Sequence, residues 1–295
     1  PGNSHKKGVV ERKERSELGR LPIGEKGIGR FGVHKLGKVI ELVSKMEGRQ
    51  EVALNIDWRI FENAEYLSDV NINIQERKAE IFKDGKTGTY IRIRNLSTNW
   101  TRGMLRNLHR SLTALNSPFD SNQSFKVVLK TDKLEWLEGL ISFKDIKEYA
   151  LFECDMKLEK NEITKFEYNF RPYDVMYGIS KRKVVFDKTV IMRKRVNKNG
   201  KNDFEDINLS KYEIGDIRIK IYAFDRDSSI LNNFIPDKAA FKNYLDENGG
   251  ISVFRDGMRI LDYGEPDNDW LGLDLKRVNA PTKNLSNNII LGAVY

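Results

Sequence analysis

The chain has 295 residues, a length typical of about two domains. Its residues are 39% hydrophobic and 32% charged, with both signs present, which argues against wholesale disorder. Lysine and arginine total 51 against 43 aspartates and glutamates, so the formal net charge is +8. A single cysteine, Cys154, excludes an intramolecular disulfide, and with three scattered histidines we predict no Cys/His metal site. No apolar run approaches the ~18 residues of a membrane span, and no signal peptide is recognisable, so a cytoplasmic protein without a membrane partner is predicted.

The first half of the chain predicts a helix, several strands and a second helix. Residues 1–20 read as a polar loop, and the glycine-rich segment Gly24–Gly37 predicts a short helix with Gly37 as its C-cap. Apolar residues at helical spacing predict an amphipathic helix over Thr101–Leu115 that covers a sheet. Strands are expected at Lys38–Lys45, Glu51–Trp58, Val70–Gln75, Tyr90–Arg94 and Phe125–Leu129. This order favours an α+β sandwich over a βαβ winding.

The pattern changes near residue 148, where we predict the boundary between two domains, 1–147 and 148–295. Strands are expected at Phe152–Leu158, Ile163–Phe170, Val184–Val196 and Ile217–Phe224. A helix is predicted over Pro236–Leu245, with the proline in its first turn. Behind it, Asp256-Gly257 between two short apolar runs predicts a hairpin. The fold class is therefore α+β in both halves.

The densest glycine cluster allows three interpretations. Residues Gly27–Gly32 match the dinucleotide pattern G-x-G-x-x-G, but the strand that should precede it is missing, and no Gly-Lys-Ser/Thr follows for a Walker A loop. The interpretation without a binding function is a glycine-rich loop that merely starts a helix. The functional interpretation is a polyphosphate cradle, because Gly27 and Gly29 leave backbone N–H groups accessible at a helix start and Lys26 and Arg30 add full positive charges.

The segment GEKGIGRFGVHKLG from Gly24 to Gly37 resembles the lid of the GHKL ATPases, the group of gyrase B, the ninety-kilodalton heat-shock chaperone, histidine kinases and MutL. It most resembles bacterial heat-shock-chaperone-like ATPases and is similar at the lid to the MORC group. Residues 87–93 resemble the family's G-T-x-I-x-I segment, and residues 2–7 look like the stretch after its first glycine box. Residues 251–260 and 273–277 resemble the strand-turn-strand and the L-N-I-S-R motif of the middle, or transducer, domain.

This resemblance implies a partial Bergerat-type α/β sandwich followed by a transducer-like α+β domain. It implies an ATP site with Mg²⁺, in which the lid closes over the triphosphate. The nucleotide-binding candidates are Gly24, Lys26, Gly27, Ile28, Gly29, Arg30, Phe31 and Thr89. For Thr89 the bland alternative is a strand threonine chosen for β propensity.

A basic residue of the second domain reaches the γ-phosphate in this family, and the resemblance points to Arg277, with Lys276 as its neighbour or substitute. A cation there would stabilise the charge that develops on the transferred phosphoryl group. The bland alternative for this pair is an ordinary solvated basic surface.

One departure from the family limits the prediction. The family's catalytic glutamate, its Mg²⁺-binding asparagine and its D-x-G-x-G box precede the lid, and none of them occurs upstream of Gly24. The chain therefore resembles the C-terminal part of such an ATPase. We expect the complete parent protein to hydrolyse ATP, to dimerise and to act on a protein or DNA client, and we expect this chain alone to be inactive.

The alternative function is a basic nucleic-acid-binding module with a vestigial nucleotide site. Between Lys181 and Lys201 there are nine lysines and arginines against one aspartate, enough to neutralise several phosphates in a salt-dependent manner. The bland interpretation is a solvated hairpin that protects a strand edge. Only Phe186 interrupts the strip, so stacking on single strands is not expected. The candidate residues are Lys181, Arg182, Lys183, Arg193, Lys194 and Arg195.

Overall fold

The computed structural model describes residues 28–66, 70–119, 126–160, 162–186, 190–191, 193–198, 201–207, 215–265, 267–280 and 284–295. The chain divides into two compact units, one up to Thr101 and one from Arg102 onward. Both contain helices and a sheet, which confirms the predicted α+β class. Among the described helices, none has both the length and the apolar character that a membrane span requires.

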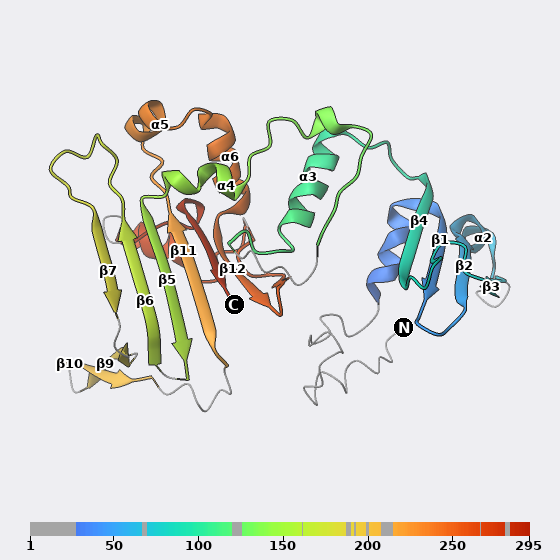
Figure 1. Cartoon of the computed structure of the whole chain (residues 1–295), viewed down its shortest axis with the longest axis horizontal. Coiled ribbons are helices and arrows are strands. Elements are labelled where there is room, and N and C mark those ends of the chain that lie inside the picture. The colour runs from blue at the N-terminus through green and yellow to red at the C-terminus, as the bar shows by residue number, and fades with distance from the viewer. Residues whose placement is uncertain are drawn as a thin grey trace. The chain divides into compact units, whose positions relative to one another are not determined.

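The first unit is built on a four-stranded antiparallel sheet in the order β3-β2-β1-β4 (Figure 1). The sheet is preceded by a 3₁₀ helix, η1, and a short helix, α2, follows β2. The elements are η1 (Ile28–Lys35), β1 (Gly37–Lys45), β2 (Glu51–Asp57), α2 (Trp58–Asn63), β3 (Asn73–Arg77) and β4 (Gly88–Leu96). All four strands lie at or beside the positions predicted from the sequence.

Two details of this unit differ from the prediction. Gly37 is not a helix C-cap: it is the first residue of β1, and a side chain there would approach Cγ2 of Ile93 to 2.6 Å and the carbonyl oxygen of Arg94 to 2.7 Å. Trp58 is not the end of a strand, because the Asp57 carboxylate accepts a hydrogen bond from the backbone N–H of Arg59 and starts α2. The glycine at position 37 is therefore needed for close packing of β1 on β4.

The second unit is larger and carries most of the described helices. Its helices are α3 (Arg102–Thr113), η3 (Leu134–Trp136), α4 (Phe143–Ile146), η4 (Lys147–Tyr149), α5 (Ser228–Phe234), α6 (Lys238–Asn248), α7 (Leu273–Asn279) and η6 (Asn287–Ile289). Its strands are β5 (Phe152–Glu159), β6 (Glu162–Phe170), β7 (Arg182–Phe186), β8 (Val190–Ile191), β9 (Arg193–Lys198), β10 (Lys201–Asp206), β11 (Ile217–Ala223), β12 (Gly250–Arg255), β13 (Met258–Ile260) and β14 (Ile290–Val294).

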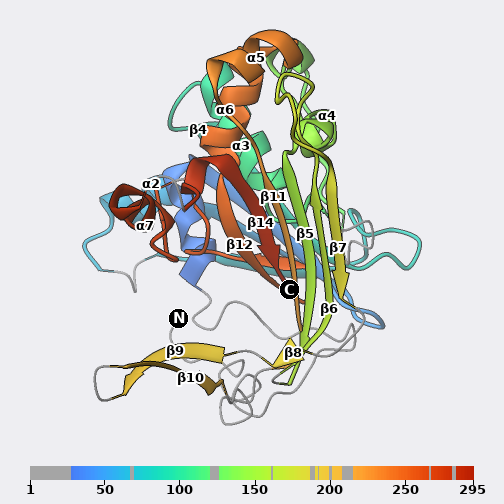
Figure 2. The ribbon, with the colours of Figure 1, turned by 90° about the vertical axis from the view of Figure 1, so that its left-hand side faces the viewer.

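The main sheet of this unit has the order β13-β12-β14-β11-β5-β6-β7, with β8 paired to β6. Figure 1 shows β7, β6, β5 and β11 side by side. Every pair is antiparallel except β12 with β14, which is parallel. Strands β9 and β10 form a separate two-stranded hairpin, visible at the bottom of Figure 2.

Helices cover one face of this sheet and form the main core. Tyr222 of β11 and Leu291 of β14 are buried beneath residues of α4, α5 and α6. Phe241 and Leu245 of α6 are 1% and 0% exposed. A smaller cluster around Ile251 and Ile290 lies against Leu271 and Leu273, just before and within α7.

The helix α3 belongs to this second unit. Arg110 forms a 2.8 Å salt bridge with Glu247 of α6, and the backbone N–H of Arg259 donates to the carbonyl of Leu115 at 3.1 Å. Phe119 packs edge-on against Phe143. The division after Thr101 therefore does not coincide with the predicted domain boundary between residues 147 and 148.

The remaining elements of the second unit agree with the prediction in part. The helix predicted over Thr101–Leu115 and the hairpin at Asp256-Gly257 are confirmed, the latter with φ of 51° and 80° at its two turn residues. Residues 126–130 are not a strand, and the single strand predicted over Val184–Val196 is divided among β7, β8 and β9. Helices α5 and α7 were not predicted.

Candidate functional site

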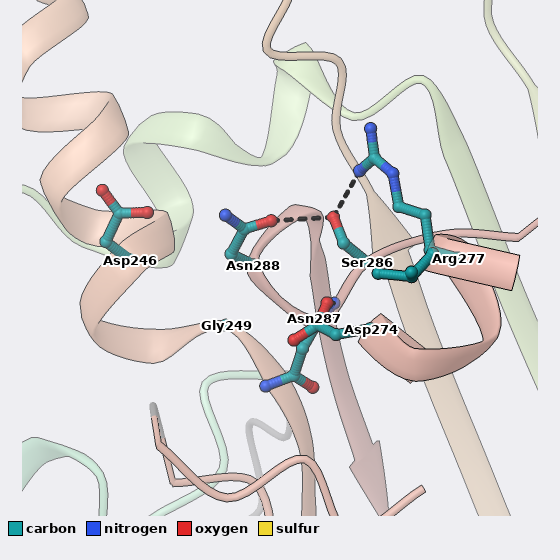
Figure 3. Close-up of a pocket in the computed structure, with 8 residues that line it drawn as sticks. Asp246, Gly249, Asp274, Arg277, Ser286, Asn287 and Asn288 are labelled. Carbon is teal, nitrogen blue, oxygen red and sulfur yellow. Dashed lines mark hydrogen bonds between the residues drawn. The ribbon is translucent and has the colours of Figure 1, made fainter. Parts of the chain in front are cut away.

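A polar pocket of about 640 Å³ lies in the second unit at the C-terminal end of α6 and beside α7 (Figure 3). Its lining contains one cation, Arg277, and two carboxylates, Asp246 and Asp274. The other lining residues are Gly249, Val278, Ser286, Asn287 and Asn288. The predicted catalytic residue Arg277 therefore lines a concave site.

Helix α7 is fixed at both ends by side chains. The Asp269 carboxylate accepts hydrogen bonds from the backbone N–H groups of Leu273 and Asp274, both at 2.8 Å. Because the first N–H groups of a helix have no partners within it, this carboxylate acts as a cap. At the other end, Nδ2 of Asn284 donates to the carbonyls of Lys276 and Ala280. The turn that contains Asp267, Asn268 and Asp269 thus positions the helix that carries Arg277.

The guanidinium of Arg277 is held by a hydroxyl group. Its Nη1 donates to Oγ of Ser286 at 2.5 Å, and that hydroxyl donates to Oδ1 of Asn288 at 2.8 Å (Figure 3). One turn earlier, the Asp274 carboxylate accepts the backbone N–H of Asn287 at 2.8 Å. Among the described residues, no carboxylate oxygen lies within 4.0 Å of the guanidinium nitrogens of Arg277. Its positive charge therefore lacks a fixed ionic partner in that part of the chain.

Lys276 occupies a different environment from Arg277. Its Nζ donates to the carbonyl of Leu271 at 3.0 Å, on its own side of α7, and Lys276 is not among the residues that line the pocket. Adjacent positions on a helix point about 100° apart, so the two cations cannot share one direction. The structure thus brings Arg277, and not Lys276, to this pocket.

A second hollow, of about 540 Å³, also has Arg277 in its lining. It includes Arg226, whose Nη1 and Nη2 bind the carboxylate of Asp246 in a two-pronged salt bridge. Asp227 in the same hollow caps α5 by accepting the backbone N–H of Ser229 at 2.8 Å. Two of the nearby carboxylates, Asp227 and Asp246, therefore already have partners.

The predicted lid lies only in part within the described residues. Gly24, Lys26 and Gly27 lie outside them, whereas Ile28, Gly29, Arg30 and Phe31 belong to η1. Thr89 is the second residue of β4, is exposed, and has its Oγ1 3.5 Å from Oγ of Ser44 on β1. These residues belong to the first unit and Arg277 belongs to the second.

The predicted basic strip is divided between two strands, and several of its charges are paired. Lys183 of β7 forms a 2.9 Å salt bridge with Glu167 of β6. On β9, Arg193 pairs with Asp206 at 2.8 Å and Lys194 with Glu205 at 3.6 Å. In the same hairpin Arg195 lies opposite Phe204. Lys181, just before β7, and Arg182, its first residue, are exposed.

Sequence reasoning missed the residues that surround Arg277. Ser286, Asn287 and Asn288 follow one another directly, and Asp274 lies three positions before Arg277, but no spacing marks them as a site. In the part of the chain that the structure describes, no group of three His, Cys, Asp or Glu side chains could hold a metal ion. No protein-family model matches this chain, and no curated protein matches it.

Proposed function

We propose that this chain supplies the phosphate-contacting parts of an ATP-driven conformational machine of the GHKL type, in which Arg277 contacts the γ-phosphate. The observation that carries the proposal is the environment of Arg277: a guanidinium that faces a polar pocket and is held by the neutral Ser286 hydroxyl. Exchanging a neutral hydroxyl acceptor for a phosphate oxygen gives the guanidinium an anionic partner, to which arginine can bind with two parallel hydrogen bonds. A carboxylate partner would have opposed that exchange.

The first unit contributes the lid in this proposal. Lys26 and Arg30 supply charge at the rim, Gly27 and Gly29 supply backbone N–H groups, and Thr89 lies near the phosphates. The adenine-reading aspartate, the Mg²⁺-binding asparagine and the catalytic glutamate would come from outside this sequence. Dimer formation, a protein or DNA client and a cytoplasmic location belong to the same proposal.

The decisive experiment measures steady-state ATP turnover by the complete parent protein with Arg277→Ala. A cation that stabilises the transferred phosphoryl group contributes about 10³-fold or more to kcat, so we expect kcat to fall by at least about 100-fold. Arg255→Ala, at an exposed position of β12 outside the pocket, is the matched control and should leave kcat unchanged. Turnover by Arg277→Ala equal to that of the control would refute the assignment of Arg277.

Calorimetric titration of this chain alone with Mg-ATP tests whether the proposed phosphate contacts are sufficient for tight nucleotide binding. Because the adenine and metal contacts would come from elsewhere, we expect weak or undetectable binding of Mg-ATP to the 295 residues. Tight binding would contradict this division of labour, even if Arg277 contacts phosphate.

The alternative function, duplex binding through the basic strip, has less support. Three of its candidate cations, Lys183, Arg193 and Lys194, are already paired with carboxylates. Neutralising a phosphate with such a residue first requires breaking an ion pair, which reduces the gain from counterion release.

A further inference from the structure

Five aromatic side chains lie in a row on one face of β5, β6 and β7. In the strand register Phe152 is opposite Phe170, and Phe166 is opposite Phe186. The rings of Phe152 and Phe170 stack with centroids 5.0 Å apart, those of Phe152 and Tyr168 stack at 6.0 Å, and those of Phe166 and Phe186 lie 5.2 Å apart. Residues 152, 166 and 186 lie on three different strands, and strand pairing brings this row together.

This aromatic face is the face opposite to the one that α4, α5 and α6 cover. Directly opposed residues share a face of a sheet, so Tyr222, which lies opposite Glu153 and is buried under the helices, is on the other side from Phe152. Phe152, at one end of the row, packs against the buried cluster of Ala223, Ile251 and Ile290. Phe166, Tyr168 and Phe170 are partly exposed, and Phe186 is 47% exposed. Their accessibility contrasts with the burial of Tyr222, at 3%.

One cation of β7, Arg182, lies at the rim of the aromatic face. Arg182 is opposite Phe170 in the register and therefore shares its face, and Lys181 precedes it. Both are exposed, and among the described residues neither has a carboxylate oxygen within 4.0 Å of its side-chain nitrogens. Lys183, whose side chain points to the opposite face, is paired with Glu167 at 2.9 Å. The unpaired charge of β7 is thus on the aromatic side.

We propose that the aromatic face of β5, β6 and β7 binds single-stranded nucleic acid. Aromatic rings at a sheet surface stack on unpaired bases, and adjacent cations neutralise the backbone phosphates. A duplex hides its base faces and offers such a surface only phosphates. A row of rings beside Arg182 therefore fits a single strand better than it fits a duplex. This site is independent of Arg277 and of nucleotide.

The test is fluorescence anisotropy of the full chain, without nucleotide, titrated into labelled oligo-dT and oligo-U of about 12 residues. We expect binding of at least one of the two strands, and the stronger of the two identifies DNA or RNA as the preferred ligand. A single cation on this face, Arg182, predicts a shallow salt dependence, with a slope of log K against log salt of about −0.7. The matching duplex should bind at least about ten-fold more weakly.

Substitutions of exposed residues of β7 test whether the nucleic acid binds at this face, and they leave the buried core unchanged. Phe186→Ala should weaken binding by about five-fold or more, because one stacking surface is lost, and Phe186→Tyr should retain it. Arg182→Ala should weaken binding and reduce the salt slope by about 0.7. The matched controls are Phe204→Ala, an exposed phenylalanine of β10, and Arg193→Ala on β9; both should bind as the unmodified chain does.

Three results would overturn the proposal. The first is no binding of either strand at low salt by a chain whose melting curve is intact. The second is equal affinity for single strand and duplex, or equal loss in the controls and in the rim variants. The third is concentration-dependent self-association that Phe186→Ala abolishes, which would make this face an interface between copies of the chain.

Discussion

The two units of this chain are stabilised in different ways. In the first unit, Ile40, Val43 and Ala53 are the only buried apolar residues among those described. Glu51 of β2, the most deeply buried charged side chain of the described residues, belongs to the same unit. The second unit buries a continuous set of aromatic and aliphatic side chains between its sheet and α4, α5 and α6. We infer that the stability of the first unit depends on a buried charged group. The stability of the second unit depends on the packing of its apolar core.

Glu51 connects the sheet of the first unit to the loop after β3. Its Oε1 accepts from Nε of Arg77 at 2.9 Å, and its Oε2 accepts from the backbone N–H groups of Glu80, Ile81 and Phe82 at 3.2, 3.0 and 3.0 Å. Burial raises the pKa of this carboxyl, but these hydrogen bonds outweigh burial and lower the pKa to about 2. Glu51 is therefore ionised at neutral pH although its side chain is fully buried.

In the second unit, the described residues of the main core are all aromatic or aliphatic. Phe241 contacts Phe224 edge-on at 5.8 Å and Tyr149 at 6.3 Å, and Tyr222 contacts both Phe119 and Phe143. Such a core responds to lost volume and not to pH. The comparison predicts opposite sensitivities for the two units.

The largest expected effect is that of Phe241→Ala. Truncating a fully buried phenylalanine removes its transfer free energy and leaves a cavity, so the free energy of unfolding should fall by about 3 to 5 kcal/mol. Urea denaturation followed by circular dichroism measures this change, and Phe204→Ala, at an exposed position, should change it little. Equal effects of the two substitutions would show that the core is not centred on α6.

Glu51→Gln should destabilise the first unit selectively. The amide places an N–H₂ group among four donors, so at least one buried donor loses its acceptor. We expect the thermal midpoint of this unit to fall by on the order of 5 °C, with faster amide hydrogen exchange in β1 and β2 and unchanged exchange in α6. Loss of protection in α6 as well would contradict the independence of the two units.

The pH dependence of stability tests whether the charge of Glu51 contributes to the first unit. The folded pKa of about 2 is below the unfolded value near 4.5, so the stabilisation is complete above about pH 4.5 and is lost as the pH falls toward 2. The difference in stability between the unmodified chain and Glu51→Gln should therefore shrink across this window. A difference that stays constant from pH 6 to about pH 2 would show that the charge of Glu51 does not contribute.

Much of the fold could be predicted from the sequence because the local signals agree with it. The run of β-branched and aliphatic residues in Lys38–Lys45, the helical spacing from Met104 to Leu112 and the Asp256-Gly257 turn each specify one element. The β9–β10 hairpin could also have been predicted, since Asn199-Gly200 between charged runs is a strong turn signal. Helix α7 was missed because its cap, Asp269, lies four residues before Leu273 instead of directly before it.

The candidate sites depended on contacts that a linear sequence does not display. Arg277 was identified by resemblance, but the Ser286 hydroxyl that holds it comes from a segment after α7. The aromatic row joins residues from three strands, and its existence depends on register. The charge of the basic strip was overestimated because its partners Glu205 and Asp206 belong to the following strand.

A smaller effect is expected from Asp237→Ala in the second unit. The Asp237 carboxylate accepts the backbone N–H of Ala240 at 2.9 Å and caps α6, the helix that carries Phe241. Loss of such a cap costs about 1 kcal/mol, and Asp237→Asn should retain most of the stability because asparagine caps equally well. Urea denaturation of both variants measures the difference. If Asn and Ala were equally destabilising, the side chain would stabilise α6 through its charge and not through the cap.

The smallest effect should be that of the Arg193–Asp206 ion pair on the β9–β10 hairpin. Both side chains are more than half exposed, at 60% and 58%, although they lie directly opposite each other and 2.8 Å apart. Water and salt screen such a pair, so a double-mutant cycle with Arg193→Ala and Asp206→Ala should give a coupling of about 0.2 to 1 kcal/mol that decreases as salt is added. A coupling of several kcal/mol would mean that the pair is excluded from solvent. In that case charge would stabilise the second unit as it stabilises the first, and the contrast between Glu51 and Phe241 would no longer distinguish them.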